Sequence, residues 1–217
     1  MTEPQGAFPL QHHFDDPDQQ SESATLGMWA FLATEVLFFG GLFTAYAVYR
    51  SSYSEAFAEA SRHLDVRLGT INTVVLIGSS LTMAMAVWAA QTGRRLQQVM
   101  YLLGTILLGS VFLGIKAVEY GHKFHEHLVP GPHFMFTGAE PDHSQIFFSL
   151  YFVMTGMHAL HMVIGIALLA ILAVRAHLGR FTPVYNTPVE LTGLYWHFVD
   201  IVWIFLFPML YLIGLHA

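Results

Sequence analysis

Long apolar stretches alternate with shorter polar segments along this chain. Five stretches are almost continuously apolar, at about residues 26–49, 69–90, 99–118, 146–174 and 189–215. A helix of about 20 apolar residues crosses the hydrocarbon core of a bilayer. The pattern predicts an all-α fold, a polytopic membrane protein with a bundle of five transmembrane helices in residues 27–217. A polar and mostly irregular arm, residues 1–26, precedes them.

Composition agrees with a membrane protein and excludes several other classes. Of the 217 residues, 54% are hydrophobic and only 11% are charged, which does not fit a soluble domain. The absence of cysteine excludes disulfides, iron-sulfur clusters and thiolate chemistry on this chain. A net charge of −6 argues against nucleic acid as a partner. The arm lacks the features of a cleavable signal peptide, so we expect the first span to direct insertion.

The last span contains two ionisable residues, His197 and Asp200, on one helical face. Ionisable groups at this depth are costly, so they normally face protein, a partner or water. One interpretation is that the two side chains bond to each other or to a neighbouring helix and hold the bundle together. The other interpretation is a functional site.

The first span has a single charged residue near its middle, Glu35. Apolar side chains of the same span are expected to crowd around it, namely Phe31, Leu32, Phe38, Phe39 and Leu42. Two interpretations stay open for this carboxyl. It is either related to proton transfer or lipid contact, or it is hydrogen-bonded within the bundle.

Three further polar residues lie in the second and third spans. Asn72 is expected to bond across to another helix. Lys116 and Glu119, three residues apart at the end of the third span, are expected to pair at the membrane edge.

Histidines occur in two places besides the last span. The connection 120–144 is rich in them, but its spacing is not that of a metal site, so we favour a solvated or partner-facing loop. His158 and His161 share one face of the fourth span. They are candidate haem ligands, yet one pair on one helix does not provide imidazoles from facing helices. We favour a polar contact with Glu35, with His197 or with another chain.

Together these residues resemble subunit III of the haem-copper oxidases. Each span contains a motif of that family, in the family's order: Thr34-Glu35-Val36-Leu37-Phe38-Phe39, Asn72-Thr73, Glu119-Tyr120, Gly156-x-His158-x-x-His161-x-x-x-Gly165, and Glu190 six residues before Trp196-His197-Phe198-Val199-Asp200. The resemblance extends from about Leu26 to the C-terminus. Many members have seven helices, and this chain matches the last five, as in some bacterial members.

The resemblance implies an accessory subunit of a proton-pumping terminal oxidase in a bacterial inner membrane. The chain would contact subunit I directly, with subunit II and a possible subunit IV in the complex. Haems and copper would lie on partner subunits, with no cofactor or catalytic residue here, and cytochrome c would be the electron donor. Glu35 and Arg175 would serve phospholipid binding or proton uptake. The remaining intramembrane polar residues would be structural: Asn72, Glu119, His158, His161, Glu190, His197 and Asp200.

Alternatives and orientation stay open at this stage. The same family also serves quinol oxidases and nitric oxide reductases. A membrane cytochrome that binds haem through His158, His161 and His197 is the alternative from a different class. Five spans place the chain ends on opposite sides of the membrane. The family implies a cytoplasmic N-terminus, and arginines in the second and fourth connections agree with it.

Overall fold

The computed structural model describes residues 10–138, 140–212 and 214, and these residues form helices and loops without a strand. Five helices are long and apolar enough to cross a membrane, and one short helix connects the first two of them. This confirms the predicted all-α architecture with five spans. In chain order the helices are α1 (Pro17–Ser52), α2 (Ser54–Ser61), α3 (Val66–Gln91), α4 (Arg95–His125), α5 (Pro141–His177) and α6 (Thr187–Tyr211).

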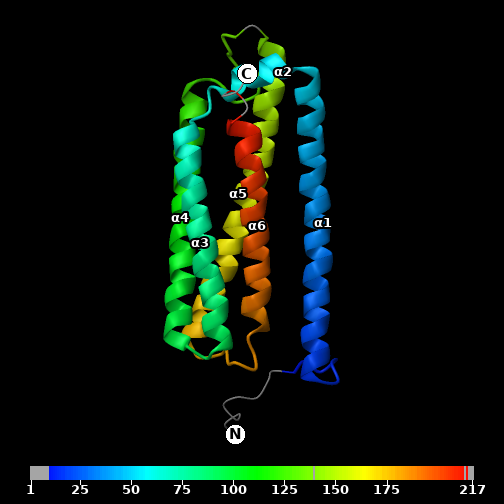
Figure 1. Cartoon of the computed structure of the whole chain (residues 1–217), viewed down its shortest axis with the longest axis vertical. Helices are drawn as coiled ribbons and strands as arrows, with labels where there is room; N and C mark the ends of the chain where they lie inside the picture. The colour runs from blue at the N-terminus through cyan, green and yellow to red at the C-terminus, as the bar shows by residue number, and fades with distance from the viewer. Residues whose placement is uncertain (1–9, 139, 213, 215–217) are drawn as a thin grey trace.

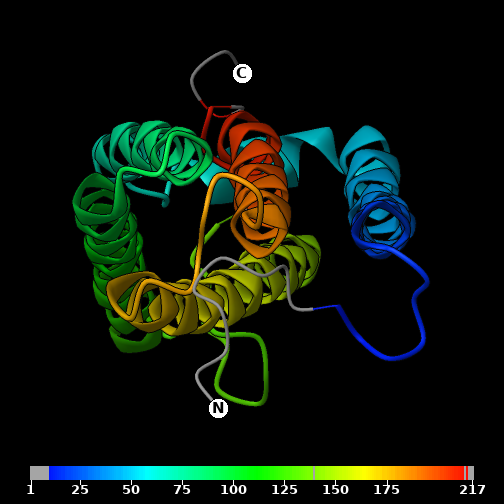
Figure 2. The same ribbon diagram turned by 90° about the horizontal axis from the view of Figure 1, so that it is seen from below.

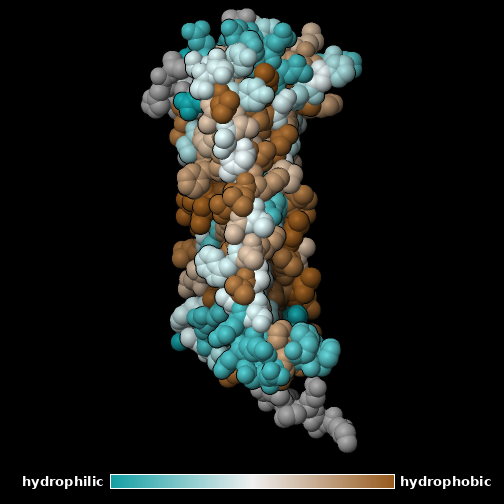
Figure 3. Space-filling model, turned by 90° about the vertical axis from the view of Figure 1, so that its right-hand side faces the viewer, coloured by the Kyte–Doolittle hydropathy of each residue, from teal (hydrophilic) through white to brown (hydrophobic). Residues whose placement is uncertain are grey.

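The five long helices run side by side and alternate in direction (Figure 1). The start of α1 and the end of α6 therefore lie at opposite ends of the molecule. Apolar side chains dominate the middle of the visible surface in Figure 3, and polar side chains gather at both ends. This distribution matches a protein whose middle zone lies in lipid and whose ends lie in water.

Every span is longer than, or shifted from, its predicted range. The helix α1 begins at Pro17, so the second part of the expected irregular arm is helical. The reason is local, because the Asp16 carboxylate accepts a hydrogen bond from the backbone N–H of Gln19 at 2.7 Å and caps the helix. Proline in the first turn also favours a helix start.

The same kind of cap begins α3. Between the first two spans, α2 is helical, and Asp65 caps α3 by accepting from the backbone N–H groups of Arg67 and Leu68. The helix α4 continues to His125 and α5 begins at Pro141, which shortens the predicted 120–144 connection at both ends. Only α6 ends earlier than predicted, at Tyr211 instead of residue 215.

Helices α3, α4, α5 and α6 form a closed bundle in which each packs against the next and α6 returns to α3 (Figure 2). Two indoles of α6, Trp196 and Trp203, lie fully buried at its centre. Glycines make room for Trp196. A Cβ added to Gly109 of α4 would lie 2.8 Å from its ring, and one added to Gly165 of α5 would lie 2.9 Å from it.

The helix α1 lies beside this bundle and contacts it along one narrow line (Figure 2). Its buried residues are Leu32, Phe39 and Tyr46, each seven residues after the last. This spacing keeps one face of a helix against its neighbours, here α5 and α6. The Tyr46 hydroxyl donates a hydrogen bond to the backbone carbonyl of Met209, near the end of α6. The rest of α1 is available to lipid or to partners.

Candidate functional site

The carboxylate of Glu35 joins α1 to the bundle through His161 of α5. Glu35 Oε2 lies 3.1 Å from His161 Nε2, and the two side chains are 18% and 11% exposed. The other ring nitrogen of His161 lies 2.8 Å from the backbone carbonyl of Met157. The predicted contact between a fourth-span histidine and Glu35 is confirmed. Both ring nitrogens of His161 are thereby engaged.

The predicted apolar surroundings of Glu35 are only partly correct. Leu32 and Phe39 are buried, and Phe39 packs edge-on against His161 at 5.4 Å between ring centroids. Phe31 and Phe38, in contrast, are 40% and 42% exposed. Both are half exposed because α1 contacts the bundle on one side only, and the Phe31 ring lies at the border of that contact, 6.1 Å from the Tyr195 ring of α6.

A second polar cluster lies inside the bundle near the end of α4. The ammonium of Lys116 lies 3.0 Å from Glu119 Oε2 and donates to the hydroxyls of Tyr211 at 2.8 Å and Tyr151 at 3.1 Å. Those two hydroxyls in turn donate to Glu119 Oε1, at 2.6 Å and 2.9 Å. The four side chains therefore satisfy one another in a closed hydrogen-bonded network.

The pairing of Lys116 with Glu119 is confirmed. Lys116 is 3% exposed and Glu119 is 2% exposed, so the pair lies inside the bundle, and α4 continues beyond it to His125. Tyr151 and Tyr211 were not among the residues predicted from the sequence. Their signal was the polar hydroxyl within an apolar span, since a buried tyrosine hydroxyl usually finds a hydrogen-bond partner.

His158 and Asn72 lie deeper in the core. The His158 ring packs between Phe112 and Trp203, with centroids 5.4 Å and 5.3 Å away. Asn72 Nδ2 donates to the backbone carbonyl of Phe112 at 3.3 Å, so the predicted bond from Asn72 to another helix is confirmed. Among the described residues, neither ring nitrogen of His158 has a hydrogen-bond partner.

His197 and Asp200 both face α3, where they line a pocket of about 290 Å³. His197 Nδ1 lies 2.8 Å from the hydroxyl of Ser80, which confirms a bond to a neighbouring helix. The alternative bond between His197 and Asp200 does not form. Asp200 is 4% exposed, and neither carboxylate oxygen has a partner within the described part of the chain.

Glu190 and Arg175 lie at the same end of the bundle, where α5 ends and α6 begins. Glu190 accepts a 2.6 Å hydrogen bond from Gln91 Nε2 and so connects α6 to the end of α3. Arg175 is exposed, and its guanidinium lies 5.6 Å from the centre of the Phe181 ring. An exposed cation at the end of a span suits an anionic group in the interface.

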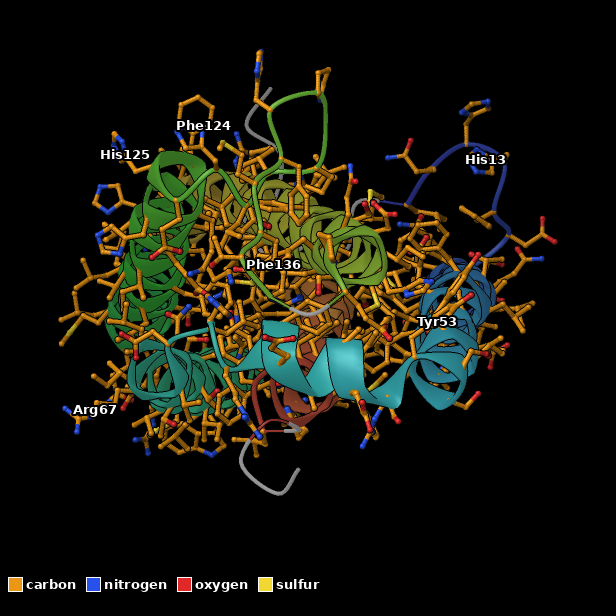
Figure 4. The ribbon with its side chains drawn as sticks, turned by 90° about the horizontal axis from the view of Figure 1, so that it is seen from above. His13, Tyr53, Arg67, Phe124, His125 and Phe136 are labelled. Atoms are coloured by element: carbon orange, nitrogen blue, oxygen red, sulfur yellow. The ribbon has the colours of Figure 1, made fainter. Side chains whose placement is uncertain are left out.

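The histidine-rich connection closes the opposite end of the bundle (Figure 4). Phe136 lies over the helices and packs against His63 and Phe148, whereas Phe124 and His125 point outward. The other histidines here are His122, His127 and His133, which are exposed, and His143, which stacks on Tyr53. Within residues 10–138, 140–212 and 214, they do not gather into a group of three potential metal ligands.

The candidate residues thus comprise polar pairs that fasten helices to one another, the exposed Arg175, and Asp200, whose carboxyl has no hydrogen-bond partner among the described residues. Comparison with known proteins agrees with the motifs. The chain is 33% identical over 191 residues to cytochrome c oxidase subunit 3 of Corynebacterium diphtheriae, covering 87% of both chains. It is 32% identical over 214 residues to cytochrome c oxidase subunit 3 of Thermostichus vulcanus, covering 98% of this chain and 96% of that protein.

Subunits of quinol oxidases are also similar to this chain. Quinol oxidase subunit 3 of Bacillus subtilis is 32% identical over 201 residues, covering 91% of this chain and 92% of that protein. The family model described as cytochrome c oxidase subunit III matches residues 16–215, which include all five spans in full. The chain therefore belongs to the cytochrome c oxidase subunit III family.

Proposed function

We propose that this chain is an accessory subunit of a proton-pumping haem-copper oxidase that oxidises cytochrome c and reduces oxygen to water. It braces the catalytic subunit I and has no redox centre of its own, with haems and copper held by subunits I and II. The observation that carries this proposal is the family match across residues 16–215. A subunit IV completes the assembly in our proposal.

The histidines support an accessory role over that of a haem-binding cytochrome. His161 uses both ring nitrogens, one for Met157 and one for Glu35. His197 bonds to Ser80, and the His158 ring is held between two aromatic rings. A haem ligand needs an imidazole nitrogen directed at the iron. These contacts instead serve helix packing.

We assign Glu35 and Arg175 to lipid contact and proton uptake. Glu35 lies where α1 meets α5, so a lipid chain or a proton carrier beside α1 reaches the Glu35–His161 pair first. Arg175 is an exposed guanidinium at the end of α5, a geometry that suits a phosphate group. Both are available on the surface of this chain, unlike the buried Lys116 and Glu119.

The proposed setting is a bacterial inner membrane with the N-terminus in the cytoplasm. Arg94, Arg95, Arg175 and Arg180 lie around the two short connections at the end where α1 begins. At the other end, Lys116 and Lys123 are buried in ion pairs and do not belong to a free loop. Excluding them leaves these four arginines against Arg50, Arg62 and Arg67 at the other end, a small excess that agrees with a cytoplasmic location of the α1 start.

A quinol oxidase is the second candidate, because the Bacillus subtilis relative with that name is about as similar as the cytochrome c oxidase relatives. The donor docks on other subunits, so the distinction lies in the complex. A dinuclear-copper cysteine motif in the accompanying subunit II, with oxidation of cytochrome c by the purified complex, supports the first candidate. Oxidation of quinol alone supports the second.

The site assignment is tested with Glu35→Ala and Arg175→Ala in the intact complex, and with Arg67→Ala, an exposed cation at the other end, as control. We expect unchanged haem content in all three. We expect Glu35→Ala to shorten the turnover lifetime or lower the proton-pumping ratio, and Arg175→Ala to lower bound phospholipid. Unchanged lifetime, pumping and lipid content in both variants would contradict the assignment.

A further inference from the structure

Asp200 is a buried acid without a hydrogen-bond partner among the described residues, and it lines a pocket on the side of the bundle. Asp200 lies near the middle of α6 and lines the pocket between α3 and α6. The rim of this pocket is aliphatic: Ile77, Ile201 and Ile204 are 54%, 51% and 48% exposed. The pocket therefore opens sideways, at the level of the lipid chains.

The polar neighbours of Asp200 are also bonded to other groups. The Ser80 hydroxyl lies close to the carboxyl and is shared with His197 Nδ1, 2.8 Å away. The Thr73 hydroxyl accepts from Trp203 Nε1 at 3.0 Å. Both oxygens of Asp200 remain without a hydrogen bond among the described residues. A buried carboxyl in this state is unfavourable, so a donor from outside the chain would stabilise it.

Depth limits where that donor comes from. With a rise of about 1.5 Å per residue, Asp200 lies more than about 15 Å from each end of α6. Lipid head groups start about 15 Å from the midplane of a bilayer, and the hydrocarbon between contains no donors. A neighbouring transmembrane helix reaches this depth and carries side chains with N–H or O–H groups.

We propose that the α3–α6 pocket is a docking site for a transmembrane helix of another oxidase subunit, which places a hydrogen-bond donor against Asp200. This inference rests on the proposed function, which supplies such a subunit. Hydroxyl, indole, amide and guanidinium side chains fit the acceptor, and the isoleucine rim fits the apolar residues around the donor. The outward face of α4 differs from this pocket because it is entirely aliphatic and suits lipid. Its exposed residues are Leu96, Met100, Leu103 and Leu107.

Site-specific photocross-linking in native membranes tests the docking face. The cross-linking amino acid benzoylphenylalanine replaces Ile201 at the rim, or Leu107 on the outward face of α4 as a matched control with 65% exposure. After irradiation, we expect a covalent adduct with another oxidase subunit from position 201 and only lipid adducts from position 107. Lipid adducts alone from position 201 in an intact complex would overturn the docking face and leave the proposed function standing. Failure of the tagged chain to co-purify with any oxidase subunit would overturn both.

Substitutions of Asp200 test the donor itself. Asp200→Asn keeps an acceptor oxygen, whereas Asp200→Leu has similar size and none. Because one hydrogen bond contributes enough for up to roughly a tenfold change in binding, we expect Asp200→Leu to lower retention of this chain in the detergent-purified complex by up to about tenfold, with Asp200→Asn closer to wild type because it keeps an acceptor. Helicity of the isolated chain should match wild type in both. Equal retention of all three proteins would overturn the role of Asp200.

Discussion

At the scale of single residues, the ion pair between Lys116 and Glu119 is the most buried charged contact. Removing one partner leaves a charge inside the bundle, so we expect Lys116→Met or Glu119→Gln to destabilise the chain by about 3–5 kcal/mol. The double variant removes both charges, and its loss should be smaller than the sum of the single losses. Thermal unfolding in detergent measures this, with the exposed Arg67→Gln as control. Additive losses in the double variant would show that the two groups do not act as a pair.

The hydrogen bond between Glu35 and His161 provides a second prediction at this scale. Polar contacts between membrane helices contribute on average about 0.6 kcal/mol and reach about 1.7 kcal/mol. A double-mutant cycle with Glu35→Ala and His161→Ala should give a coupling energy in that range. Because His161 Nδ1–H donates to the Met157 carbonyl, the Nε2 of a neutral ring accepts, and the amide N–H of Glu35→Gln can donate to it; this variant should therefore lose less than Glu35→Ala. A coupling energy near zero would mean that the contact does not fasten α1 to the bundle.

Partners of polar residues were only partly predictable from the sequence. The Glu35–His161 contact was among the alternatives because both residues are unusual in apolar spans. The pairing of Lys116 with Glu119 was predicted, but its two tyrosine partners were not, since Tyr151 and Tyr211 belong to other helices and tyrosine is common in membrane spans. The sequence left open whether His197 and Asp200 bond to each other or to a neighbouring helix. Sharing a helical face brings two side chains near one another, but Ser80 of α3 offers His197 the better geometry.

At the scale of helices, Trp196 fixes how closely α4, α5 and α6 approach. A Cβ at Gly109 or Gly165 would lie under 3.0 Å from its rigid ring. We expect Gly109→Ala and Gly165→Ala to destabilise the bundle by about 1–3 kcal/mol through overpacking. Combining either one with Trp196→Phe, which leaves a smaller ring, should recover part of that loss.

The control for these substitutions lies on the same helix. Gly114 of α4 has no atom within 4 Å of an added Cβ, so Gly114→Ala should leave the melting temperature unchanged or raise it. Thermal unfolding of the three variants in one detergent makes the comparison. If all three alanines had the same effect, close packing against Trp196 would not be the cause.

The number and order of the spans were predictable, and their ends were not. Crossing the bilayer requires about 20 apolar residues, and the apolar stretches met that requirement. A helix extends beyond its apolar stretch where a polar residue caps its end, as Asp16 caps α1 and Asp65 caps α3. Hydropathy averaged along the chain does not reveal these polar helix ends.

At the scale of the whole molecule, four helices form a closed bundle, and α1 lies beside it along a narrow contact (Figure 2). The sequence did not predict this division, because the first span is as apolar as the others. Two outward features follow from it and suit a subunit of a larger complex. One is the partly exposed Glu35–His161 pair between α1 and α5, and the other is the pocket that contains Asp200.

The most direct test of the account is purification through a tag on this chain in mild detergent, with optical spectra before and after it is separated from its partners. We expect haem and copper to co-purify with the tagged chain and then to leave entirely with the large subunits. The isolated chain should show no haem absorbance while remaining helical. Haem retained on the isolated chain would contradict the account and would identify its intramembrane histidines as ligands.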